Sequence, residues 1–106
     1  MIDWTRVTEL QNEFGKSDFD EIVEIFLEEV EQLIKKLRDD ADRSNLRNDL
    51  HFLKGSALNL GFSNLAILCQ AGETEASQGQ ADSVDLSAII QSYNKSKKVF
   101  QDGLVS

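Results

Sequence analysis

The sequence has no proline, one cysteine (Cys69) and one histidine (His51) among its 106 residues. Without proline, long helices can run uninterrupted, and a β-rich fold with proline-marked turns is disfavoured. A lone cysteine excludes an internal disulfide and fits a reducing cytoplasm. Because Cys69 and His51 match no zinc-binding spacing, we expect no metal site and interpret Cys69 as a small buried hydrophobic residue.

Positive charge is also scarce, with 11 Lys and Arg against 19 Asp and Glu and a net charge of -8. This balance argues against nucleic acid and anionic membranes as partners. The apolar runs are only a few residues long, too short to cross a bilayer. The N-terminus lacks a cationic segment followed by an apolar stretch, so we expect no signal peptide. The sequence is therefore typical of a cytoplasmic protein, and we expect a monomer with protein partners.

Apolar residues recur at helical spacing in five segments, approximately 3–14, 18–42, 44–60, 64–78 and 85–104. The second segment also carries an acidic row, which we interpret as a solvated face: Glu21, Glu24, Glu28, Glu29 and Glu31. Short connections between long amphipathic helices imply antiparallel neighbours. We therefore expect one all-α domain over residues 1–106, an antiparallel four-helix bundle with the short first helix capping one end.

The helix expected around His51 has a clear core stripe. At about 100° per residue on a helical wheel, five apolar residues lie on the side opposite His51: Leu46, Leu50, Leu53, Ala57 and Leu60. His51 is therefore predicted to point away from the bundle. Its nearest angular neighbours are Arg47, Asn48, Lys54, Gly55 and Leu58.

A lone helical histidine is usually an ordinary surface or core residue, but three features here favour a chemical role. Lys54 follows at i+3, where a lysine can offset the charge of a phosphoryl group on the imidazole. Gly55 follows at i+4, and a glycine inside a helix costs about 1 kcal/mol relative to alanine, which suggests that space is needed there. A neutral imidazole also has a ring nitrogen free to attack phosphorus.

The remaining machinery of a phosphoryl-transfer enzyme is missing from the sequence. There is no glycine-rich phosphate loop, no nucleophile elbow and no carboxylate cluster that indicates a metal site. The sequence thus predicts a carrier with a nucleophile and a nearby cation, whose partner supplies the rest.

The segment from His51 to Gly61, HFLKGSALNLG, closely resembles the signature of histidine-containing phosphotransfer (HPt) domains, H-x-L-K-G-S-[AS]-x-x-L-G. The resemblance continues at Leu65, Cys69 and Glu73, at the spacing that this family shows on its next helix. Upstream, residues 25–29 look like the long second helix of the family. The resemblance covers residues 17–78 well and the rest only as a helical pattern.

The resemblance implies a four-helix bundle with an N-terminal cap, acting as a phosphotransfer intermediate and not as an enzyme. His51 would accept a phosphoryl group from the aspartate of a receiver domain and pass it to another receiver aspartate. Lys54 would stabilise the charge and Gly55 would leave steric access. The partners implied are response-regulator receivers and a hybrid histidine kinase. The protein would need no cofactor of its own, because the Mg²⁺ belongs to the receiver.

The sequence departs from the family at Leu58, where a small or polar residue is more common. We prefer the interpretation that Leu58 packs against a neighbouring helix. Alternatively, it enlarges a docking surface for the partner that also includes Arg47, Asn48 and Ile25. We interpret Ser56 as a polar helix-packing residue.

Two other functions stay open. The chain could be the histidine-bearing domain of a larger hybrid sensor kinase, although the start at Met1 favours a stand-alone protein. Without a nucleotide-binding segment it would not autophosphorylate in either case. It could also be a non-catalytic helical adaptor, but the intact set of His51, Lys54 and Gly55 argues against this.

Overall fold

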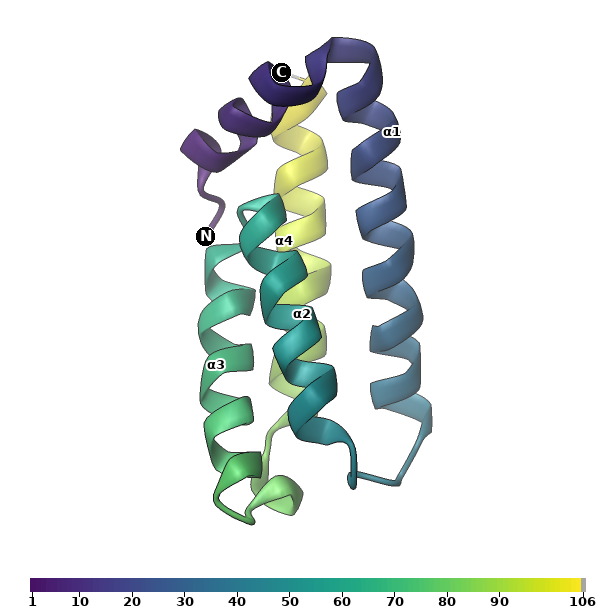
Figure 1. The fold of residues 1–106 in the computed structure, drawn as a ribbon, viewed down its shortest axis with the longest axis vertical. Coiled ribbons are helices and arrows are strands. Elements are labelled where there is room, and N and C mark those ends of the chain that lie inside the picture. The colour runs from purple at the N-terminus through teal and green to yellow at the C-terminus, as the bar shows by residue number, and fades with distance from the viewer. Residues whose placement is uncertain (106) are drawn as a thin grey trace.

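The protein is built from four compactly packed helices, with no strand among residues 1–105, which the computed structural model describes. Successive helices alternate in direction around a shared core (Figure 1). The all-α class is therefore confirmed. The helices are α1 (Trp4–Asp39), α2 (Leu46–Leu60), α3 (Ser63–Ser77) and α4 (Leu86–Val105), with a 3₁₀ turn, η1 (Ala81–Ser83), before α4.

The first helix differs from our expectation. The short capping helix expected over residues 3–14 is not a separate element, because α1 includes it and is the longest helix. Gly15 interrupts the helical geometry inside α1 with φ 77° and ψ 167°. Glycine adopts such angles because it has no Cβ. At the break α1 changes direction, so that its first part lies across one end of the molecule (Figure 1).

Contacts made at and just before the start of α1 anchor this first part of the helix. Trp4 stacks on Phe100 of α4, with ring centroids 6.2 Å apart. The backbone N–H of Asp3 donates to the carbonyl of Gly61 over 2.7 Å. Gly61 has φ 78°, and a Cβ there would lie 2.7 Å from the Asp3 carbonyl oxygen. Glycine is thus needed at this turn both for its backbone angle and for the close approach of the N-terminus.

The core lies along the common axis of the helices, in a molecule measuring 42 × 21 × 21 Å. All five predicted core residues of α2 are at most 2% exposed. Phe62 packs against Phe100 and Tyr93, with ring centroids 5.4 and 6.2 Å away. Cys69 is fully buried, as predicted, and burial raises the pKa of its thiol to about 12.

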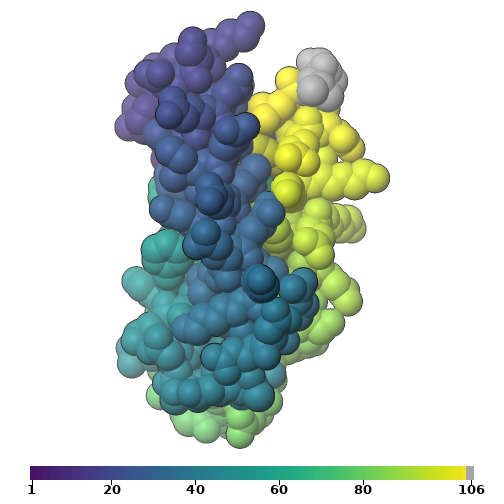
Figure 2. All heavy atoms as spheres, turned by 90° about the vertical axis from the view of Figure 1, so that its right-hand side faces the viewer, coloured from purple at the N-terminus to yellow at the C-terminus, as the bar shows by residue number. Residues whose placement is uncertain are grey.

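Another face of the molecule is formed by α1 and α4, which lie side by side in Figure 2. Glu31 of α1 accepts hydrogen bonds from Lys97 (2.6 Å) and from the Tyr93 hydroxyl (2.7 Å) of α4. These two donors, Lys97 above all, hold the pKa of Glu31 below its ordinary value. Glu31 therefore does more than contribute to a solvated face, since it joins two helices.

Every helix described in residues 1–105 is too short or too polar to cross a membrane.

The backbone angles of Gly15 and the open space at Gly55 predict opposite effects of alanine on the free energy of unfolding. Gly15→Ala should lower the free energy of unfolding by about 1–3 kcal/mol, because Gly15 has a positive φ that L-residues rarely adopt. Gly55→Ala, inside α2 and with nothing within 4 Å of the added Cβ, should raise it by up to about 1 kcal/mol. Urea denaturation of both variants measures the difference. Equal stabilities would show that the backbone at Gly15 is not constrained.

Candidate functional site

The position of His51 follows from the packing of α2. Its chain neighbours on the core side, Leu50 and Leu53, are fully buried. The His51 side chain itself is 68% exposed. Because successive residues of a helix are rotated by about 100°, burying those leucines turns the imidazole outward. The predicted orientation of His51 is therefore confirmed.

The imidazole has one close protein partner, Glu73 of α3. Nδ1 of His51 lies 2.9 Å from Oε1 of Glu73. An ionised carboxylate only accepts hydrogen bonds, so we assign the ring hydrogen to Nδ1. In the neutral imidazole this leaves the lone pair on Nε2. The contact thus orients the ring and makes Nε2 the nitrogen available for chemistry.

Lys54 reaches the same carboxylate from one turn further along α2. Its Nζ lies 3.0 Å from Oε2 of Glu73 and donates to Oε1 of Gln70 over 2.9 Å. Lys54 and then His51 lower the pKa of Glu73 below its ordinary value, while partial burial of the carboxyl opposes them. Glu73 is therefore ionised at neutral pH. The structure brings together the predicted lysine and histidine, but through a third residue on another helix.

Gly55 leaves open space on the other side of the imidazole. It is exposed, and a Cβ built on it would meet nothing within 4 Å outside its own helix. A partner can approach α2 closely at this position.

The remaining residues of the predicted docking surface are all exposed. Arg47 and Asn48 are exposed on α2, and Ile25 of α1 is 46% exposed. Leu58 is 56% exposed, so our preferred interpretation that it packs against a neighbouring helix is wrong. Burial of the core stripe fixes the rotation of α2, and Leu58 lies on the same outward side as His51. Ser56 is buried, as expected for a helix-packing residue.

Sequence reasoning gave no role in the site to four residues of α2 and α3, although it included Glu73 in the family resemblance: Phe52, Ile67, Gln70 and Glu73. Glu73 carried a signal, because it follows the buried Cys69 at i+4 and so places a carboxylate near the inward face of α3. Gln70 had no comparable signal, since its contact with Lys54 depends on the register between two helices. Phe52 and Ile67 are 50% and 67% exposed, which their apolar character did not predict.

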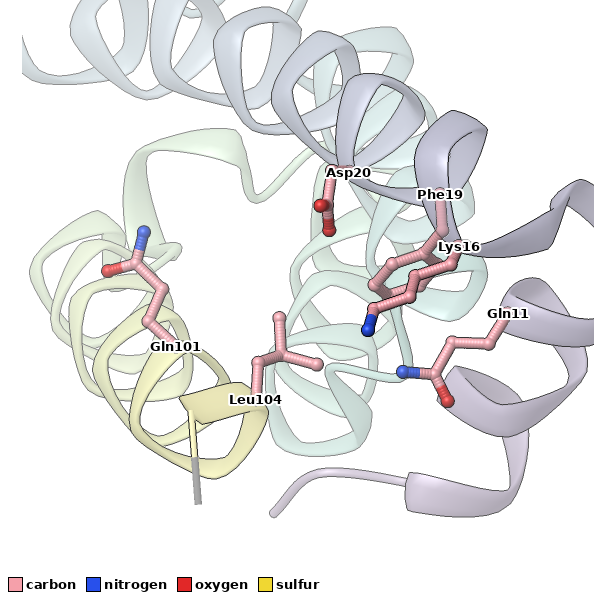
Figure 3. Close-up of a pocket in the computed structure, with 6 residues that line it drawn as sticks. All are labelled: Gln11, Lys16, Phe19, Asp20, Gln101 and Leu104. Carbon is pink, nitrogen blue, oxygen red and sulfur yellow. The ribbon is translucent and has the colours of Figure 1, made fainter.

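A hollow of about 700 Å³ lies elsewhere, between the break in α1 and the end of α4 (Figure 3). Its lining residues come only from these two helices and include none of the candidate site residues: Gln11, Lys16, Phe19, Asp20, Gln101 and Leu104. Within residues 1–105, no group of three or more His, Cys, Asp or Glu side chains could hold a metal ion. The His51 side chain lies outside this hollow and is 68% exposed on the surface.

Comparison with known proteins adds one match. The family model described as Hpt domain matches residues 21–98. Neither a curated protein nor a solved structure matches the chain. The matched range includes the second half of α1, all of α2 and α3 with His51 and Glu73, and the first part of α4.

The lowered pKa of Glu73 predicts a pH-dependent contribution to stability. A carboxyl with a depressed folded-state pKa contributes fully above its unfolded pKa of about 4.3 and loses this contribution as the pH falls through the folded value. Wild-type protein should therefore melt above Glu73→Gln at pH 7, and the difference should shrink as the pH falls below the unfolded pKa of about 4.3 and through the lowered folded value. Thermal melts from pH 7 to pH 3 measure this. Glu75→Gln removes a charge from the same helix without the Lys54 contact and is the control. A pH-independent difference between wild type and Glu73→Gln would contradict the assignment.

Proposed function

The chain belongs to the Hpt domain family, and from this membership and the geometry around His51 we propose that the protein is a phosphorelay carrier. His51 accepts a phosphoryl group from the aspartate of one receiver domain and passes it to the aspartate of another. The observation that carries the proposal is an exposed imidazole whose Nδ1 is held by Glu73, with Lys54 on the same carboxylate.

The proposed transfer uses Nε2 as the nucleophile. Its lone pair forms the N–P bond as the bond between phosphorus and the receiver's aspartyl oxygen breaks, and the aspartate leaves as a carboxylate. The hydrogen on Nδ1 stays in its hydrogen bond to Glu73 (2.9 Å). Return of the phosphoryl group to a second aspartate reverses these steps, with neutral imidazole as the leaving group. Glu73 is therefore proposed as the residue that keeps one tautomer of His51 ready in both directions.

Lys54 is proposed to stabilise the phosphorylated state. A phosphoryl group on Nε2 adds negative charge beside a carboxylate that is already ionised. Lys54 also donates to the neutral amide of Gln70, and this contact can be exchanged for one with the phosphoryl oxygens at small electrostatic cost. Contacts of this charge-assisted kind contribute roughly 1.5–3 kcal/mol.

The protein is proposed to be a carrier and not a catalyst. The receivers supply the acidic pocket and Mg²⁺, and this chain supplies the nucleophile, the cation and an accessible surface. Response-regulator receivers and a hybrid histidine kinase are the proposed partners, in the cytoplasm, with residues 1–106 acting as one monomeric domain. The proposed docking surface surrounds His51 and includes Arg47, Asn48, Leu58 and Ile25.

The first test is whether His51 takes up phosphate. Purified protein should be incubated with each phosphorylated receiver encoded in the same genome. At least one receiver should transfer a label that is labile in acid and stable in base, as expected for phosphohistidine. His51→Gln should take up none, while Lys98→Gln, an exposed change on α4, should label normally. Label on His51→Gln, or no label on wild type from any receiver, would reject the proposal, and the second result would favour an adaptor.

Replacement of Gly55 by a long side chain should change the melting temperature and the rate of phosphotransfer in opposite directions if this glycine provides access to His51. Gly55→Ala should keep transfer because a methyl group fits the open space, whereas Gly55→Gln should slow it by an order of magnitude or more, because a long side chain blocks the approach of the receiver. Both variants should melt above wild type, since both residues have higher helix propensity than glycine. Transfer rates and melting temperatures from the same samples give both readouts. Full activity of Gly55→Gln would show that this glycine has no access role.

A further inference from the structure

The exposed large apolar side chains are not spread evenly over the molecule. Two of them, Met1 and Trp4, belong to the N-terminal segment, and Val99 stands on α4. The other four are on the helices nearest His51: Ile25, Phe52, Leu58 and Ile67. Leu58 and Ile67 are the most exposed of the set, at 56% and 67%. Exposed apolar area gathered on one face is typical of an interaction surface.

The register between α2 and α3 places Leu58 and Ile67 at the same level. His51 pairs with Glu73, and Lys54 pairs with Gln70. The two helices are antiparallel, so a step of three residues towards the C-terminus on α2 matches a step of three residues towards the N-terminus on α3. Continued in the same way, this register brings Leu58 level with Ala66, one residue from Ile67. The offset along the helix axis is about 1.5 Å, so Leu58 and Ile67 lie at nearly the same level of two adjacent helices, and we call these two exposed residues the patch.

This patch lies within reach of any globular partner that contacts His51. Leu58 is seven residues from His51, which is about 10 Å along the helix. A standard protein interface buries about 800 Å² on each partner, equivalent to a disc with a radius of about 16 Å. An interface centred on His51 would therefore cover the patch. A second copy of this chain seated here would block access to the histidine, so the surface fits a receiver better than a dimer.

Gln70, three residues from Ile67 on α3, already has hydrogen-bond partners within the chain. Gln70 accepts a hydrogen bond from Lys54 and donates to the Thr74 hydroxyl over 3.3 Å. When a partner covers this part of α3, most of the favourable free energy should therefore come from removing the Ile67 side chain from water. Apolar anchors surrounded by satisfied polar groups commonly dominate the energy of an interface.

We infer that Ile67 is a docking residue for the receiver. Together with Leu58, it anchors a receiver domain on α3 as well as α2 while the receiver's aspartate reaches His51. This inference rests on the proposed function. It assigns a docking role to a residue on α3, which lies outside the docking surface described above.

The test compares two matched variants, Ile67→Ser and Val99→Ser. Both replace an exposed β-branched residue, and because Val99 is 38% exposed against 67% for Ile67, any fall in the melting temperature should be larger for Val99→Ser. The probe is the phosphorylated receiver that labels wild-type protein fastest in the screen. Ile67→Ser should raise the receiver concentration needed for half-maximal transfer at least about fivefold and leave the rate at saturation unchanged. Val99→Ser should change neither value.

Each alternative outcome has a distinct meaning. If wild type is labelled and Ile67→Ser needs no more receiver than wild type, docking does not extend onto α3 and the inference is wrong, while the proposed function stands. If no receiver labels wild type, the proposed function fails and the inference fails with it. If sedimentation shows a dimer that Ile67→Ser converts to a monomer, the patch binds a second copy and the assignment to a receiver is overturned.

Discussion

Burial of one side of α2 is the constraint on which the site depends. The stripe from Leu46 to Leu60 is almost completely removed from water. Burying a leucine contributes roughly 1.5–3 kcal/mol, an upper estimate because unfolded chains already bury some apolar surface. Rotating α2 by one residue would expose several of these side chains and bring His51 into the core. The packing of the bundle therefore holds the imidazole on the surface.

The second constraint on the site is the burial of the Glu73 carboxylate, whose side chain is only 16% exposed. A charge removed from water is costly unless it is paired. Glu73 has two partners from α2, with one of its oxygens facing His51 and the other Lys54. The same contacts that compensate the charge also orient the imidazole and hold a cation beside it. The contacts that join α2 to α3 are thus the same contacts that orient the His51 imidazole.

The two sides of the bundle are specialised differently. Where α1 meets α4, Glu31 with Tyr93 and Lys97 joins the helices through charged and polar groups. On α2 and α3, by contrast, the apolar side chains of Phe52, Leu58 and Ile67 are at least half exposed. An open surface of this kind suits a carrier, which must present its nucleophile to another protein's active site and release it again. An enclosed pocket would exclude such a partner.

The sequence alone determined the all-α class, the core stripe of α2, the burial of Cys69 and the outward direction of His51. All of these depend on helical periodicity within one segment, which is a local property. The short pattern HFLKGSALNLG was also sufficient to indicate the family. Only the tertiary structure decided that α1 continues through Gly15, since a positive φ can end a helix or redirect it. The role of Glu73, the contact of Gln70 and the exposure of Leu58 and Ile67 depend on the register and rotation of neighbouring helices. Those quantities come from how several apolar stripes are buried together, and no single segment contains them.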